Sequence, residues 1–171
     1  MIVSAGRSGA SSFLGTHTNK IDAKGRVQAP ADFRKALDLV SFNGFFCVPS
    51  LEGDHLDCGG PDYIEGLKAS IAALDPFDPD RRALEVALLG QARPVTFDQD
   101  GRFILHKELR DHAQIADRAK FVGLGDTFQI WRDDGADEII SDQKARARAA
   151  LRRLRNPGVT PPSGAEAEAG S

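Results

Sequence analysis

The chain has 171 residues, of which 41% are hydrophobic and 27% are charged, and its formal net charge at pH 7 is −3. This length suits one compact domain or two small subdomains of about 60 to 75 residues that share a core. No segment approaches the ~20 apolar residues of a membrane span, and residues 1–12 lack the apolar region of a signal peptide. We therefore expect a cytoplasmic protein without a membrane partner.

The acidic balance argues only mildly against a nucleic-acid-binding protein, because the charges are unevenly distributed. Acidic side chains concentrate over residues 75–80 and in the C-terminal tail, whereas bases concentrate over residues 20–35 and 144–155. The distribution of charge therefore leaves DNA binding open.

The first half of the chain is predicted to form a ββαββ unit over residues 13–60, after a disordered N-terminus at residues 1–12. Pro30 suits the first position of its helix, and Phe33 and Leu37 give that helix an apolar stripe. The predicted elements are strands at 13–22, 26–29, 45–49 and 55–58 and a helix at 30–37.

Residues 61–90 are predicted to form a helical hairpin. Apolar residues at three-to-four spacing indicate a helix over 61–74. Asp78 is expected to cap a second helix, which has Pro79 at its first position and ends at Gly90.

The second half is predicted to repeat the ββαββ order over residues 91–135. A basic helix follows over 136–155, which either contacts phosphates or packs on a neighbouring subunit through its alanines and leucines. The tail over 156–171 is predicted to be disordered. The elements of the second unit are strands at 93–98, 102–105, 120–124 and 127–132 and a helix at 106–112.

One segment of the chain occurs twice, because residues 19–27 recur in outline at 95–103. The distance from Asp22 to Asp98 is 76 residues. A repeat of this length indicates two copies of one supersecondary unit. We therefore predict an α+β fold in which two tandem ββαββ units intertwine as a pseudo-symmetric β-barrel with the helices outside. The same offset relates Gly25 to Gly101, Arg26 to Arg102 and Arg34 to Arg110.

The repeated segment is predicted to be a tight turn that presents an arginine. Gly25 can supply the positive φ that such a turn often needs. Arg26 follows it directly, so its guanidinium is held near the turn, where it can reach a phosphate or the O6 and N7 atoms of guanine. Lys24 at the tip suits a phosphate contact. Asp22 either orients Arg26 through an ion pair or stabilises the turn by accepting backbone hydrogen bonds.

The first half also carries a longer pattern, which reads Lys20-x-Asp22-x-x-Gly25-Arg26-Val27-x-x-Pro30-x-x-x-Arg34-Lys35-x-Leu37. This pattern resembles the AbrB-type swapped-hairpin DNA-binding domain. Two such units separated by a helical hairpin resemble the MraZ family of bacterial repressors of the division and cell-wall gene cluster.

The resemblance implies transcriptional repression at short direct repeats upstream of the chain's own operon. It also implies double-stranded DNA as the partner, a nucleoid location and assembly into a closed homo-oligomeric ring. No enzymatic activity, cofactor or metal is predicted. The candidate DNA-binding residues are Lys20, Lys24, Arg26, Arg34, Lys35, Arg102 and Arg110, and the structural turn residues are Asp22, Gly25, Asp98 and Gly101.

The chain departs from the family pattern at three places. Residues 55–60 lack the aromatic side chains expected of the last strand in the first unit. In the second unit His106 replaces the proline, and Asp111 replaces the second base of the helix. The second unit is therefore expected to be less suited to phosphate contact.

Two other functions compete with DNA binding. An antitoxin-like interaction module would need apolar anchors in its C-terminal segment, where Val159 is the only large apolar residue of 156–171. A hydrolase or decarboxylase would need a nucleophile beside a base, and Cys58 and His55 are near one another only in sequence. We expect Cys58 and Cys47 to be free thiols that are at least half-buried.

Overall fold

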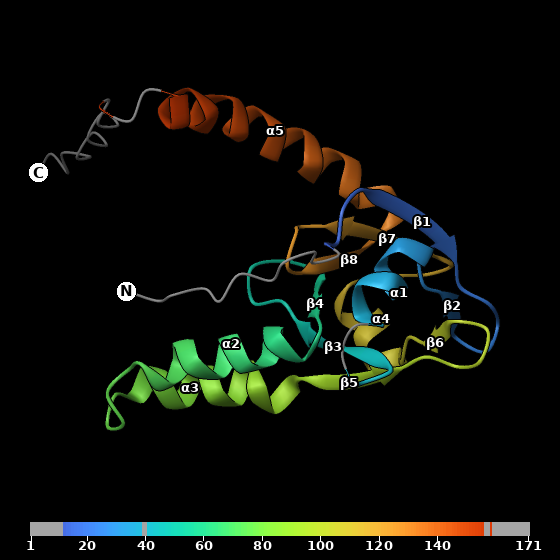
Figure 1. Cartoon of the computed structure of the whole chain (residues 1–171), viewed down its shortest axis with the longest axis horizontal. Helices are drawn as coiled ribbons and strands as arrows, with labels where there is room; N and C mark the ends of the chain where they lie inside the picture. The colour runs from blue at the N-terminus through green and yellow to red at the C-terminus, as the bar shows by residue number, and fades with distance from the viewer. Residues whose placement is uncertain (1–11, 39–40, 156–157, 159–171) are drawn as a thin grey trace, which may run out of the picture. The chain divides into compact units, whose positions relative to one another are not determined.

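The computed structural model describes residues 12–38, 41–155 and 158 (Figure 1). These residues form an α+β fold with five α-helices and two antiparallel sheets. The chain divides into one unit that ends at Ala136 and a second unit that begins at Asp137. The predicted disorder of 1–12 and 156–171 concerns segments that lie outside the described residues, except for Ser12 and Gly158.

The first half contains the elements that the sequence predicts, with shifted ends. The strand expected from Phe13 begins only at Thr16, because Phe13 forms an isolated bridge with Gly125 instead. Pro30 precedes the helix at its N-cap, with an extended ψ of 134°, and does not occupy the first helical position. The elements are β1 (Thr16–Lys20), β2 (Arg26–Gln28), α1 (Ala31–Leu37), β3 (Gly44–Pro49) and β4 (Leu56–Gly59).

The helical hairpin consists of α2 (Pro61–Ala72) and α3 (Pro79–Ala87). As expected, Asp78 caps α3, since its carboxylate accepts the backbone N–H of Asp80 at 2.9 Å. The expected end at Gly90 is wrong, because α3 stops at Ala87 and Gly90 lies inside the short 3-10 helix η1 (Leu89–Gln91).

The second half returns the same order of elements. His106 takes the place of Pro30 at the N-cap of α4, with a φ of −59° and a ψ of 150° that resemble those of the proline, so this departure leaves the backbone path unchanged. The final helix begins three residues earlier than expected, at Asp133. The elements are β5 (Arg93–Thr96), β6 (Arg102–Ile104), α4 (Lys107–His112), β7 (Arg118–Gly123), β8 (Phe128–Arg132) and α5 (Asp133–Arg155).

The strands form a six-stranded sheet in the order β1-β7-β8-β4-β3-β5 and a separate ribbon of β2 and β6. The corresponding strands of the two halves are β1 and β5, β2 and β6, β3 and β7, and β4 and β8. Replacing each strand by its counterpart reverses the order of the six-stranded sheet and leaves every strand pairing unchanged. Hydrogen bonds between the described strands do not close the expected barrel. The turns after β1 and β5 lead into the ribbon, so these two strands remain the edges of the sheet (Figure 1).

The core of the part of the chain that ends at Ala136 is an aromatic cluster to which both halves contribute side chains. Phe128 lies at its centre, with ring centroids 5.1 Å from Phe33 and 5.2 Å from Phe45. Phe33 and Leu37 are buried, which confirms the apolar stripe of α1. β4 packs well without aromatic residues, because Leu56 and Cys58 are fully buried. Each buried large side chain contributes about 1.5–3 kcal/mol of hydrophobic stabilisation.

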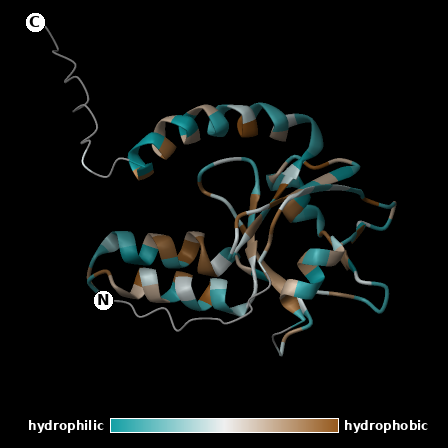
Figure 2. Cartoon of the chain, turned by 45° about the horizontal axis from the view of Figure 1, so that its top comes forward, coloured by the Kyte–Doolittle hydropathy of each residue, from teal (hydrophilic) through white to brown (hydrophobic). Residues whose placement is uncertain are grey.

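The C-terminal helix α5 is rich in charge, and most of it has the hydrophilic colour in Figure 2. Leu151 and Leu154 are exposed in the single chain. Its role, either in phosphate contact or in packing on a neighbouring subunit, stays a prediction. Among the described helices, none is both long and apolar enough to cross a membrane.

Candidate nucleic-acid interface

The first repeated segment forms the tight turn that the sequence predicts. Gly25 has a φ of 80°, and its N–H donates to the carbonyl oxygen of Asp22 at 3.0 Å. One carboxylate oxygen of Asp22 accepts the backbone N–H groups of Lys24 and Arg26, both at 2.9 Å. Aspartate is favoured in such turns because its short side chain bonds the backbone just downstream. Asp22 therefore closes the turn through its carboxylate.

Asp22 also holds the side chain of Arg26. The other carboxylate oxygen of Asp22 lies 2.6 Å from Nε of Arg26, and about a third of each side chain is exposed. The backbone N–H of Arg26, and then its side chain, lower the pKa of Asp22 below its ordinary value. Asp22 thus both closes the turn and holds the side chain of Arg26 through its Nε atom.

The second turn repeats these contacts but adds a carboxylate. Asp98 accepts the N–H groups of Asp100 and Arg102, both at 2.9 Å, and Nε of Arg102 at 3.1 Å. Gly101 has a φ of 73°. Asp100 stands where the first turn has Lys24, and its carboxylate accepts Nη2 of Arg102 at 2.9 Å. Arg102 is therefore held between two acids, whereas Arg26 is held by one.

The helix arginines pack on the turns of the opposite halves. A Cβ at Gly101 would collide with the guanidinium of Arg34, and a Cβ at Gly25 would lie 3.8 Å from Nη2 of Arg110. Both arginines are half-buried, and their Nε atoms are buried without a hydrogen-bond partner among the described residues. Arg34 therefore does not lie on an exposed face of α1, whereas its neighbour Lys35 is exposed.

Backbone hydrogen bonds also join each turn to the opposite half of the chain. Ala29 donates its N–H to the carbonyl oxygen of Gly101 at 3.2 Å, and Leu105 donates to that of Gly25 at 2.9 Å. Nε2 of Gln28 also donates to the carbonyl oxygen of Gly101 at 3.2 Å. Each turn is thus supported by the half to which it does not belong.

Five of the seven candidate DNA-binding residues have no carboxylate partner among the described residues. Within residues 12–38 and 41–136, every other lysine and arginine lies within 4 Å of a carboxylate, and most of these ion pairs are on the surface. The cations for which no ion pair exists among the described residues are Lys20, Lys24, Arg34, Lys35 and Arg110.

One neighbouring cation, Arg118, was not predicted from the sequence. Arg118 on β7 is the register partner of Lys20 on β1, so the two side chains leave the same face of the sheet. The residues are about 100 positions apart, and no local pattern indicates that they meet. Only the pairing of β1 with β7 reveals that they are neighbours.

The residues considered for catalysis, Cys58 and His55, each have other side chains as neighbours. Cys58 faces Cys47 across β3 and β4, and burial raises the pKa of the Cys58 thiol. Nε2 of His55 lies 3.1 Å from the amide of Gln129 and 3.3 Å from Asp57. A buried thiol with a raised pKa is a poor nucleophile. Among the described residues, no group of three or more His, Cys, Asp or Glu side chains could hold a metal ion.

Comparisons of the chain with a family model and with curated proteins all identify the same family. A family model described as "MraZ protein, putative antitoxin-like" matches residues 88–155. The transcriptional regulator MraZ of Gluconobacter oxydans is 41% identical over 158 residues, which cover 90% of this chain and 95% of that protein. The regulator of the same name from Pelagibacter ubique is 40% identical over 141 residues, covering 82% of this chain and 90% of that protein.

A third relative, the transcriptional regulator MraZ of Rickettsia felis, is 36% identical over 144 residues, which cover 84% of this chain and 97% of that protein. Identity of this level over most of both chains establishes that the proteins belong to one family. A family of transcriptional regulators agrees with the prediction of a non-enzymatic protein. The chain therefore belongs to the MraZ family of transcriptional regulators.

Proposed function

We propose that this protein is a sequence-specific DNA-binding repressor of its own division and cell-wall gene cluster. The observation that carries the proposal is that Lys20, Lys24 and Arg110, for which the described residues provide no ion pair, gather around the first turn. Phosphate contacts by lysine and arginine supply most of the affinity of proteins for DNA, because they release condensed counterions. Arg26, fixed beside Gly25, is the candidate for reading base edges.

We further propose that the two halves are duplicated AbrB-like units and that the protein binds short direct repeats as a homo-oligomeric ring. The symmetric strand pairing supports the duplication. One turn makes few contacts, so avidity across several subunits would supply the affinity. Large apolar side chains that are exposed in the part of the chain before Asp137 are consistent with an oligomer, among them Leu14, Leu51 and Val86.

The test is a titration of the purified protein against DNA from the region upstream of its own operon, with a scrambled duplex as competitor. Selective retardation in stepped bands is the expected result. The plot of log K against log salt should be steep, with a slope of about −0.9 for each phosphate neutralised. Equal, weak binding to both duplexes would contradict the proposal and favour the protein-interaction module.

Arg26→Ala is the decisive variant, and we expect it to weaken operator binding by about 1–3 kcal/mol at matched salt. Lys68→Ala is the matched control, because Lys68 lies on α2 and is paired with Glu65 at 3.1 Å. Loss of binding in the control as well would show that the effect of Arg26→Ala is not specific to the turn.

A further inference from the structure

The two turns lie in corners that correspond in backbone but not in charge. The first corner comprises residues 20–26, with Arg110, Asp117 and Arg118 of the second half. The second corner comprises residues 96–102, with Arg34, Asn43 and Gly44 of the first half. Equivalent bonds define them, since Ile21 donates its N–H to the carbonyl oxygen of Asp117 at 2.8 Å, and Phe97 donates to that of Asn43 at 3.1 Å.

The strand next to each turn shows the difference. In the first corner Lys20 and Arg118 are register partners across β1 and β7. In the second corner the corresponding partners across β5 and β3 are Thr96 and Gly44. Like charges that face each other across two strands are destabilising, so the first corner carries a repulsion that the second lacks.

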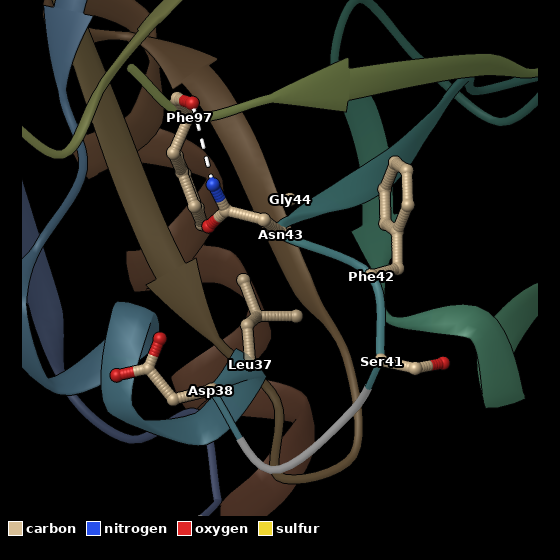
Figure 3. Close-up of a pocket in the computed structure, with 7 residues that line it drawn as sticks. All are labelled: Leu37, Asp38, Ser41, Phe42, Asn43, Gly44 and Phe97. Carbon is tan, nitrogen blue, oxygen red and sulfur yellow. Dashed lines mark hydrogen bonds between the residues drawn. The ribbon is translucent and has the colours of Figure 1, made fainter. Parts of the chain in front are cut away.

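The second corner is nearly free of exposed cations. Figure 3 shows its outer part, where the amide of Asn43 donates to the carbonyl oxygen of Phe97 at 3.5 Å and Gly44 offers no side chain. Its remaining cations are Arg102, which is held by two carboxylates, and Arg34, which is packed on Gly101.

The charges of the two corners therefore differ by three. The first corner has five cations and the carboxylates of Asp22 and Asp117, which leaves it at +3. The second corner has two cations, Arg34 and Arg102, and two carboxylates, which leaves it neutral. The five cations of the first corner are Lys20, Lys24, Arg26, Arg110 and Arg118.

We infer that the first corner alone binds the DNA backbone and that Arg118, supplied by the second half, is one of its phosphate contacts. This inference rests on the proposed function and names the part of the molecule that performs it. A phosphodiester bound between Lys20 and Arg118 would relieve their mutual repulsion and release counterions. The neutral second corner offers no comparable gain.

Arg118 is available for this contact although it has an acidic neighbour. Its Nη1 lies 3.9 Å from a carboxylate oxygen of Asp133, and about half of its side chain is exposed. Asp133 lies closer to Nζ of Lys120, at 3.4 Å, and accepts the hydroxyl of Thr18 at 3.4 Å. A long, exposed ion pair of this kind contributes little and can be replaced by a phosphate.

The experiment compares the variants Arg118→Gln and Lys20→Gln with Arg102→Gln in the full-length protein. Operator DNA is titrated at several salt concentrations, and thermal unfolding checks that each variant is folded. The first two variants are each expected to make the slope of log K against log salt shallower by about 0.9 per subunit contact. Arg102→Gln should leave that slope unchanged.

Two results would overturn the inference. If Arg118→Gln and Lys20→Gln retain the wild-type slope, or if Arg102→Gln reduces it as strongly, the corners do not differ as inferred. Selective operator binding by the wild-type protein would in either case leave the proposed function standing. Absence of selective binding by the wild type would instead reject the proposed function, and the inference with it.

Discussion

The guanidinium group of Arg34 lies directly against Gly101, in the turn of the opposite half of the chain. The corresponding arginine, Arg110, lies beside Gly25. The 76-residue repeat is therefore more than two similar segments, because each copy provides the support on which the turn of the other copy rests. Substitutions in one half should consequently affect the turn of the other.

Gly101→Ala is expected to lower the free energy of unfolding by about 1–3 kcal/mol, as measured by urea denaturation. A φ of 73° is unfavourable for alanine, and its Cβ would force the Arg34 side chain to move. Gly25→Ala is the control, because its Cβ would have 3.4 Å to its nearest neighbour, the carbonyl oxygen of Leu105. The cost at Gly101 should be the larger of the two.

A double-mutant cycle with Arg34→Ala isolates the contact between the halves. If Arg34 and Gly101 interact as described, Gly101→Ala should cost less in the Arg34→Ala background than in the wild type. Equal costs in both backgrounds would mean that the conformation of the turn alone determines the effect.

The turn carboxylates predict a loss of stability in acid. Backbone N–H groups of Arg26 and Arg102, respectively, are the largest cause of the lowered pKa of Asp22 and of Asp98. A carboxylate whose pKa is lower in the folded state contributes stability above its unfolded pKa and loses that contribution as pH falls through the folded value. The ordinary pKa is 3.8, so the loss should occur below about pH 4.

Asp22→Asn and Asp98→Asn test this pH dependence through urea midpoints between about pH 6 and pH 3. Each variant should be less stable than the wild type at the upper end, and the difference should shrink towards the lower end. A difference that stays constant with pH would show that the carboxylate charge is not what stabilises the turn.

Phe128 is predicted to be a major stabilising residue of the core. Its ring also lies 4.9 Å from Phe13, in addition to its contacts with Phe33 and Phe45. Phe128→Ala should cost about 3–5 kcal/mol in the free energy of unfolding, measured in urea. The same substitution at Phe77, which is 96% exposed, should change stability by less than about 0.5 kcal/mol. Similar values at the two positions would contradict the described packing.

Tyr63 provides a spectroscopic test, because it is the only tyrosine in the chain. Burial, and then the nearby charge of Asp57, raise its pKa well above the ordinary value of 10.0. Its stabilising contribution is therefore complete below about pH 10 and declines as pH rises further. Absorbance should show no tyrosinate in the folded protein at about pH 11 and ionisation near pH 10 in urea. A folded-state titration near pH 10 would place Tyr63 in solvent.

Local chemistry made much of this fold predictable. Asp78 before Pro79 indicated the start of α3, and Phe33 with Leu37 indicated the buried face of α1, because capping and helical spacing depend on neighbouring residues. The turn at Gly25 was predictable for the same reason. The repeat added long-range information, since it indicated a second turn at Gly101 with the same contacts.

Pairings between distant residues were not predictable in the same way. The register of Lys20 with Arg118 depends on how β1 and β7 align, and no short segment records that alignment. The packing of Arg34 on Gly101 likewise depends on the exchange of support between the halves. The barrel was expected because the repeat indicated two small units that share a core, and this reasoning does not specify that, among the described strands, β2 forms its ladder with β6.

Under the function proposed above, the palindromic strand order has a consequence for the kind of DNA site that the molecule would match. A body with true two-fold symmetry presents the same surface at both ends and suits a palindromic site. Here one continuous chain makes both halves, so Lys24 at one end can correspond to Asp100 at the other. The pseudo-symmetric body therefore has a direction, and a body with a direction suits sites that repeat head to tail.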